Sequence, residues 1–127
     1  MAKQIVVPEG APAPIGPYSP AVWAGDLLFV SGQTPIDPAT GDIVAGTVAD
    51  QARQSIANVR SILEAAGLGL DHVVKATLFI KNMDDFAAIN EAYAGLFAKP
   101  YPARSCVEVA RLPRDVLVEI EVVARRS

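Results

Sequence analysis

Three side chains that can do chemistry alternate along residues 103–110. A strand in this stretch would place Arg104, Cys106 and Glu108 on one of its faces. The guanidinium of arginine carries parallel N–H donors, so Arg104 is suited to bidentate capture of a substrate carboxylate. The spacing therefore indicates an anion-binding position on a strand.

A second group of charges follows on residues 116–125. Glu119 and Glu121 share one face of a strand there, and an apolar row takes the other: Val116, Val118, Ile120 and Val122. We expect this strand to pair with 103–110 as a hairpin, which would set Arg104 and Cys106 near Glu119. A carboxylate beside a bound substrate can orient a water or shuttle a proton. The alternation by itself also fits solvated charges on an edge strand that discourage aggregation.

The sequence has one cysteine, Cys106, and one histidine, His72. A single cysteine cannot form an intrachain disulfide and a single histidine cannot build a zinc site, so we expect no metal. A nucleophilic Cys–His pair would require the two side chains to meet in three dimensions. The simpler expectation is that Cys106 packs as a small hydrophobe and that His72 caps or flanks a strand.

The pattern of the whole chain predicts an α+β fold with two helices on one face of a mixed, mainly antiparallel sheet. Strands are expected at 27–33, 72–81, 103–110 and 116–125, and helices from Thr47 to Gly67 and from Asp84 or Asp85 to the residues before Pro100. Thr47 and Asp50 form a capping box, and Gly67 stops the helix. The proline-rich residues 8–20 should be extended or turning.

Length and composition predict one domain, 1–127, that assembles with copies of itself. Half of the 127 residues are hydrophobic, and the mean hydropathy is +0.29. We expect the sheet face without helices to bear the apolar row of 116–125 and an oligomer to cover it. The net charge of −3 argues against a nucleic-acid binder. No membrane helix or signal peptide is expected, and the cytoplasm is the expected compartment.

Several segments carry the pattern of a known family. They are residues 16–21 (Gly-Pro-Tyr-Ser-Pro-Ala), 31–35 (Ser-Gly-Gln-Thr-Pro), the helix 51–59, and 102–113 followed by 118–121. The C-terminal segment is long and specific, whereas Ser-Gly-Gln alone is weak. Together the segments resemble the Rid (YjgF) family, specifically its RidA type, over essentially the whole chain. The resemblance implies a chorismate-mutase-like fold, a homotrimer with sites between subunits, and no metal or organic cofactor.

The resemblance also implies an activity, the hydrolysis of 2-aminoacrylate, 2-iminobutanoate and related imines to 2-oxo acids and ammonia. Carried over residue by residue, it gives the substrate carboxylate to Arg104, assisted by the backbone at Cys106. It gives the attacking water to Glu119.

The remaining candidates are substrate-binding residues. The resemblance implies that Tyr18 and Ser31 line the pocket from a facing wall or a neighbouring subunit, and that Gly32 permits close backbone approach. Asn90, on the second helix, is a further candidate. Each also has a structural interpretation, with Tyr18 a packed turn aromatic, Ser31 and Gly32 a strand-ending turn, and Asn90 a surface polar residue.

Two other functions fit parts of the sequence. A non-catalytic protein that binds small carboxylates such as 2-oxo acids would need Arg104 but not Glu119. A ribonuclease or translation inhibitor is the third reading, and the acidic balance and lack of a basic-aromatic stripe disfavour it. Glu108 and Glu121 are expected to be structural charges, with Glu108 able to pair with Arg111 or Arg114.

Overall fold

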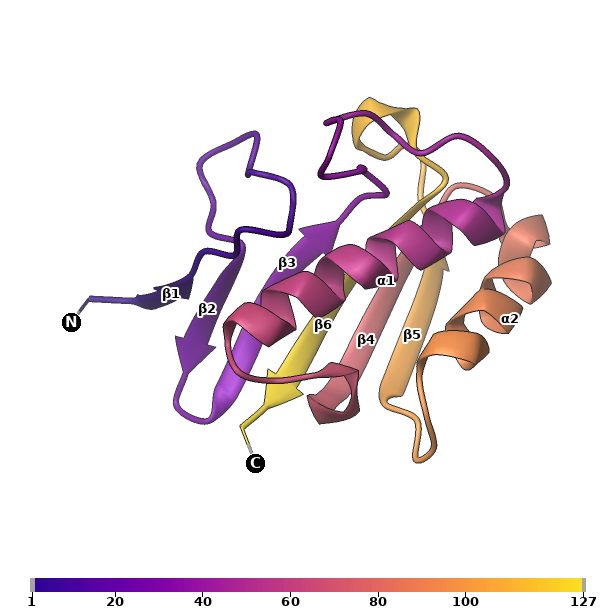
Figure 1. Ribbon diagram of the computed structural model, residues 1–127. Coiled ribbons are helices and arrows are strands. Elements are labelled where there is room, and N and C mark those ends of the chain that lie inside the picture. The colour runs from indigo at the N-terminus through magenta and orange to yellow at the C-terminus, as the bar shows by residue number, and fades with distance from the viewer. Residues whose placement is uncertain (1, 127) are drawn as a thin grey trace.

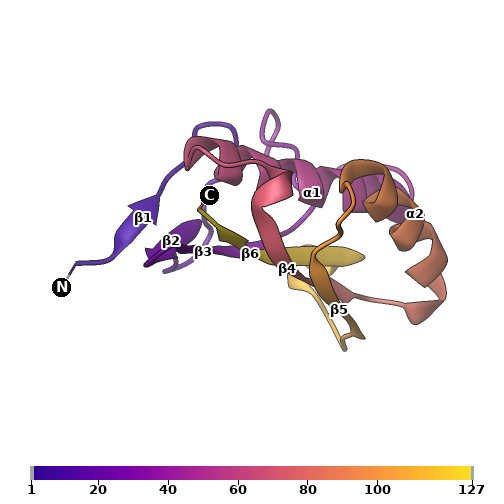
Figure 2. The same cartoon turned by 90° about the horizontal axis from the view of Figure 1, so that it is seen from below.

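The computed structural model describes residues 2–126 and shows one layer of helices on one six-stranded sheet (Figure 1). The strands are β1 (Gln4–Val6), β2 (Ala21–Ala24), β3 (Leu27–Gln33), β4 (Val73–Ile80), β5 (Ala103–Glu108) and β6 (Val118–Arg125). The helices are α1 (Val48–Ala65) and α2 (Phe86–Leu96), and short 3-10 turns lie at Leu70–His72, Met83–Asp85 and Pro113–Asp115. The expected α+β class, with both helices on one face, is confirmed (Figure 2).

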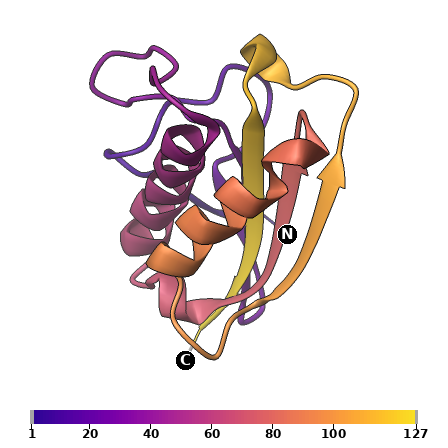
Figure 3. The same cartoon turned by 90° about the vertical axis from the view of Figure 1, so that its right-hand side faces the viewer.

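The strand order is β1-β2-β3-β6-β4-β5, and every neighbouring pair is antiparallel except β4 and β5. The expected hairpin between β5 and β6 is therefore wrong, because β4 lies between them. The cause is α2, which connects β4 to β5 as a crossover and so makes these two strands parallel neighbours at the sheet edge (Figure 3). β1 and β2 were not expected, because both strands are short and flank the proline-rich segment.

The core lies between the helices and the inner face of the sheet. The apolar row of β6 belongs to it, since Val118, Ile120 and Val122 are 0%, 0% and 3% exposed. The expectation that this row covers the helix-free face is wrong. β6 is a central strand, and its inner face lies under α1. The helix-free face instead bears Phe29 and Val107, which are 48% and 43% exposed.

The local signals of α1 are confirmed. Thr47 caps the helix and exchanges hydrogen bonds with Asp50 as a capping box, and Gly67 adopts a φ of +79° just beyond the end. In β4, Ala76, Leu78 and Ile80 alternate onto the buried inner face, whereas Val74 is exposed because a bulge interrupts the register between Val73 and Lys75.

The structure places no helix that is long and apolar enough to cross a membrane within residues 2–126.

Candidate functional site

A cavity of about 470 Å³ opens on the helix-free face of the sheet, at the ends of β3 and β6. Four of the residues singled out from the sequence line it: Tyr18, Ser31, Gly32 and Glu119. The proline-rich segment 12–20 forms one wall and the turn Pro113–Asp115 another. We call this the carboxylate half-site, after Glu119.

A β-bulge shapes the floor of the carboxylate half-site. Val30 pairs with Val122 and Gln33 with Ile120, so Ser31 and Gly32 together stand opposite the single residue Glu121. The Ser31 hydroxyl donates to the Ser19 carbonyl at 2.7 Å and thereby ties the proline-rich wall to β3. A β-bulge changes the direction of a strand and of its side chains, and bulges are frequent beside active sites.

Gly32 lies against the side chain of Glu119. A Cβ atom at this position would be 2.9 Å from the Glu119 carboxyl carbon and 3.0 Å from its Oε1. Glycine at this position permits the close approach, and what approaches the backbone is the carboxylate of the same chain.

Glu119 is half-buried and has no hydrogen bond or ion pair with any residue of 2–126. Burial raises the pKa of its carboxyl, and the like charge of Glu121 raises it further. A carboxylate that is desolvated and unpaired is a better proton acceptor than one on an open surface.

Arg104 lies on the opposite side of the sheet, in a second cavity of about 270 Å³ beneath α2. Its guanidinium stands 4.9 Å from the ring centroid of Tyr93 and 5.6 Å from that of Phe86. Asn90 lines the same cavity, and its Oδ1 is buried without a hydrogen-bond partner. We call this group the guanidinium half-site.

The aromatic rings hold the guanidinium without neutralising it. Within residues 2–126 no carboxylate pairs with Arg104, so its N–H donors are free for an anionic ligand. Phe86 and Tyr93 were not among the residues predicted for the site. Their spacing with Asn90, at i, i+4 and i+7, was the signal that all three share one face of α2.

Cys106 follows Arg104 on the same face of β5 and is half-buried. Burial raises the pKa of its thiol, and the nearby Arg104 offsets only part of the rise. His72 is no partner for it. Leu78, which pairs with Cys106, follows His72 by six residues, about 20 Å along a strand. His72 instead accepts a hydrogen bond from the Gly69 amide, as a residue that flanks a strand.

The backbone N–H of Cys106, unlike its half-buried thiol, lies at an open edge of the sheet. β5 is an edge strand, and the Val109 N–H donates to the Ile80 carbonyl of β4 at 2.9 Å. Amide directions alternate along a strand, so the N–H groups of Arg104 and Cys106 point away from β4. The Cys106 amide therefore faces the free edge of the sheet, two residues beyond Arg104.

The two half-sites are too far apart to act on one small molecule within a chain. Arg104 is level with Ala76 of β4 and Glu119 with Phe79, about 10 Å further along the strand. Two strand spacings add about 10 Å across the sheet, and the side chains leave opposite faces. The expected proximity of Arg104 and Glu119 is wrong for a single chain.

Three other charged residues near the site, Glu108, Arg111 and Arg114, have partners within the chain. Glu108 accepts a hydrogen bond from the Met83 amide at 2.8 Å and does not pair with either arginine proposed for it. Arg111 pairs with Asp115 at 2.8 Å, and Arg114 donates to the Gly41 carbonyl at 3.1 Å. No group of three or more potential metal ligands lies together within residues 2–126.

The sequence profile of the family described as endoribonuclease L-PSP matches residues 8–126. The chain belongs to that family, the YjgF/Rid family. The resemblance found in the sequence is thereby confirmed, and so is the fold that it implied.

Similar proteins of this family are found in archaea and bacteria. A RutC family protein of Pyrococcus horikoshii is 55% identical over 125 residues, which are 98% of this chain and 99% of the relative. The 2-iminobutanoate/2-iminopropanoate deaminase of Escherichia coli is 51% identical over 129 residues, with 99% of each chain covered.

Solved structures agree with the fold over its full length. A putative endoribonuclease from Thermotoga maritima has a TM-score of 0.95 and 48% identity, with 99% of each chain covered. Escherichia coli TdcF, solved with bound serine, has a TM-score of 0.92 and 48% identity, with 98% of this chain and 100% of TdcF covered.

Proposed function

We propose that this YjgF/Rid protein hydrolyses 2-imino acids such as 2-iminobutanoate and the imine form of 2-aminoacrylate, releasing 2-oxo acids and ammonia. The observation that carries the proposal is the pair of complementary half-sites. One offers a free guanidinium and an outward amide to a carboxylate, and the other offers an unpaired, desolvated carboxylate to a water. The deaminase name of the Escherichia coli relative supports the reaction. Serine bound to TdcF supports a ligand with a carboxylate next to a nitrogen-bearing carbon.

The proposed site is assembled between two copies of the chain. A homotrimer whose contacts run head to tail brings the guanidinium half-site of one subunit to the carboxylate half-site of the next. The helix-free sheet face, with Phe29 and Val107 exposed, supplies apolar surface for such an assembly.

The reaction needs only positioning and proton transfer. Arg104 and the Cys106 amide hold the carboxylate of the imine, which fixes its electrophilic carbon in front of Glu119. Glu119 accepts a proton from the attacking water as the oxygen bonds to that carbon. The resulting carbinolamine collapses when its nitrogen takes up a proton. The C–N bond breaks to release ammonia, and the hydroxyl group gives its proton to Glu119 or to solvent as the C=O bond of the 2-oxo acid forms. A carboxyl with a raised pKa can both accept and return the proton.

The most direct test is release of ammonia and 2-oxo acid from 2-aminoacrylate generated in situ. We expect the wild-type protein to accelerate release above the uncatalysed rate. Tight binding of 2-oxobutanoate without any acceleration would instead favour the carboxylate-binding alternative. The endoribonuclease name of the family makes RNA cleavage a further assay, although Glu119 and Glu121 give the larger cavity an acidic lining that repels phosphate.

Subunit mixing tests the shared site. Arg104→Ala and Glu119→Gln should each be nearly inactive, whereas heterotrimers formed by co-refolding the two should regain about a quarter of wild-type activity. Each site then needs an intact Arg104 from one subunit and an intact Glu119 from its neighbour, and random assembly supplies both in about one site in four. Light scattering should give about 40 kDa, three times the 13.4 kDa chain. A monomer, or a mixture that stays inactive, would contradict the shared site.

Gly32→Ala should fold and assemble but lose about 10- to 100-fold in kcat, because the added methyl group displaces the Glu119 carboxylate. The far end of Glu119 can rotate away, so the thermal midpoint should change little. Gly95→Ala is the matched control, since its Cβ would meet nothing within 4 Å and should leave the rate unchanged. Wild-type kinetics for Gly32→Ala would show that the placement of Glu119 does not matter.

Cys106→Ser should retain activity within a few-fold of wild type, because the backbone amide and not the thiol acts on the substrate. The raised pKa keeps the thiol protonated at neutral pH and therefore a poor nucleophile. Steady-state kinetics on the assembled protein provide the measurement. Complete loss of activity in a correctly assembled Cys106→Ser variant would restore the nucleophile interpretation.

A further inference from the structure

Helix α1 carries a row of polar side chains on the face that covers the sheet. Gln51, Ser55 and Asn58 are spaced at i, i+4 and i+7 and are 9%, 0% and 1% exposed. Apolar side chains fill such positions at lower cost, because a buried polar group is unfavourable unless it is hydrogen-bonded. The contacts of this row show what it holds.

Asn58 holds the chain that follows the β-bulge. Its Nδ2 donates to the Thr34 carbonyl at 3.0 Å and to the Ile36 carbonyl at 2.9 Å, and its Oδ1 accepts from Gln54 at 2.9 Å. Both donors of the amide are thus used on one short backbone segment. Thr34 and Ile36 line the carboxylate half-site, so Asn58 fixes a wall of that cavity from behind.

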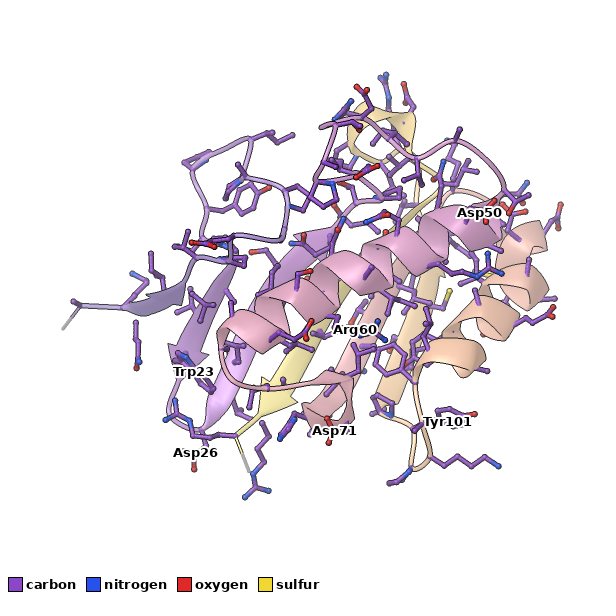
Figure 4. The ribbon with its side chains drawn as sticks, in the orientation of Figure 1. Trp23, Asp26, Asp50, Arg60, Asp71 and Tyr101 are labelled. Atoms are coloured by element: carbon purple, nitrogen blue, oxygen red, sulfur yellow. The ribbon has the colours of Figure 1, made fainter. Side chains whose placement is uncertain are left out.

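Gln51 holds the start of β6. Its Oε1 accepts from the Leu117 amide at 2.8 Å, and the Leu117 carbonyl accepts from the Lys81 amide at 3.0 Å. Leu117 is therefore fixed on both sides, two residues before Glu119. Figure 4 labels the adjacent Asp50, which marks this end of α1, where the loops around 34–46 and 113–115 also lie.

We propose that Gln51 and Asn58 are positioning residues for the reaction proposed above, on which this inference rests. They clamp two backbone segments, 34–36 and 117–119, to one rigid helix, and so keep Glu119 against Gly32 and in line with the cavity wall. Neither side chain lines the cavity, so each acts through the backbone that it holds. Without these hydrogen bonds, the segment after β3 and the residue before β6 would lose their fixed connection to α1, and the Glu119 carboxylate would be held less firmly toward the water that it activates.

Ser55 provides an internal control. It lies in the same row, between the other two, but its buried Oγ has no hydrogen-bond partner. Ser55→Ala should therefore leave kcat and KM unchanged, whereas substitutions that remove the hydrogen bonds of Gln51 or Asn58 should change them.

The test compares four variants of the assembled protein. Gln51→Met removes the acceptor and should lower kcat about 10-fold with KM changed less than about 2-fold, because Glu119 acts on water and not on the bound carboxylate. Gln51→Glu keeps an acceptor for the Leu117 amide and should stay within about 3-fold of wild type. Asn58→Leu should raise KM about 5- to 10-fold by releasing the cavity wall. Ser55→Ala completes the set.

A readout independent of activity completes the test. Amide hydrogen exchange at Leu117 should accelerate in Gln51→Met and return towards wild type in Gln51→Glu. Faster exchange with wild-type kinetics in Gln51→Met would overturn the positioning role, and so would equal losses in Ser55→Ala. If the wild type hydrolyses no imine, the proposed function fails by itself. The affinity for 2-oxobutanoate then tests whether Asn58 holds the cavity wall. Asn58→Leu must lower this affinity, and Ser55→Ala must leave it unchanged.

Discussion

Arg104→Lys should lose about 30- to 1,000-fold in kcat/KM although the charge is retained, which corresponds to about 2–4 kcal/mol of transition-state binding. Lysine is a point charge and cannot reproduce the planar fork that binds both oxygens of a carboxylate. The environment of Arg104 adds to the loss. The guanidinium carbon lies 4.9 Å from the ring centroid of Tyr93 and 5.6 Å from that of Phe86, and a lysine ammonium would not reproduce the planar group that occupies this position.

Two measurements make this result specific. Arg53→Lys, in the exposed ion pair with Asp50 on α1, should leave the rate unchanged. The affinity for 2-oxobutanoate should fall together with turnover, because Arg104 holds the carboxylate that substrate and product share. Near-wild-type kcat/KM for Arg104→Lys would show that this residue does not anchor the substrate.

The faces of the strands could be predicted from the sequence, but their neighbours could not. Alternation places Arg104 with Cys106, and separates Glu119 from Ile120, whatever the partner strand. It does not say which strand pairs with which, because that depends on contacts distant in sequence. Residues 109–117 are few enough to suggest a hairpin between β5 and β6. In the structure this connection instead crosses the end of β4, which lies between the two strands because α2 makes β4 and β5 parallel neighbours. A local rule therefore gave the wrong neighbour while the assignment of residues to faces held.

The helix-free face shows the same limit in another form. Every strand of an open sheet has two faces, and the apolar row of β6 is equally consistent with a core or an interface. Only the position of α1 decides that this row is buried inside the subunit. The bulge at Ser31 and Gly32 was likewise not expected, because it arises from the register between β3 and β6 and not from either sequence alone.

The resemblance named these chemical groups as candidates, and the structure shows how one subunit divides them between two cavities. Tyr18, Ser31, Gly32 and Glu119 share one cavity, whereas Arg104 lies beyond the sheet. Figure 4 labels Tyr101, which lines the guanidinium half-site from the loop after α2, well away from Asp50. A single subunit thus holds a guanidinium half-site and a carboxylate half-site. On the proposed mechanism, each becomes a complete site only with the other half-site from a neighbouring subunit.

Glu119→Gln should reduce imine hydrolysis about 10²- to 10⁴-fold, the usual range for loss of a general base, with the lower end favoured by the reactivity of imines in water. Glutamine keeps the size of the side chain but cannot accept the proton of the attacking water. The affinity for 2-oxobutanoate should persist or increase slightly, because a negative charge facing an anionic ligand is removed. Calorimetric binding beside ammonia release separates the two effects.

The raised pKa of Glu119 predicts how the protein responds to pH. A carboxyl whose pKa is higher when folded than when unfolded favours folding in its protonated form, and that contribution is lost as the pH rises through the folded pKa. At neutral pH the wild type therefore bears the cost of an ionised, desolvated Glu119. Glu119→Gln should consequently be more stable than wild type at neutral pH, with the difference shrinking in acid. Thermal melts across the pH range provide the measurement.

Glu121→Gln is the matched variant for the same site. It removes the like charge that raises the pKa of Glu119 and should lower that pKa, while leaving the proton acceptor in place. Hydrolysis requires ionised Glu119, so activity falls as the pH drops through its pKa, and in Glu121→Gln this fall should move to lower pH. A rate that survives Glu119→Gln, or an acid limb unmoved by Glu121→Gln, would show that another group activates the water. The two variants together tie the rate to one carboxylate, because one abolishes its basicity and the other only shifts it.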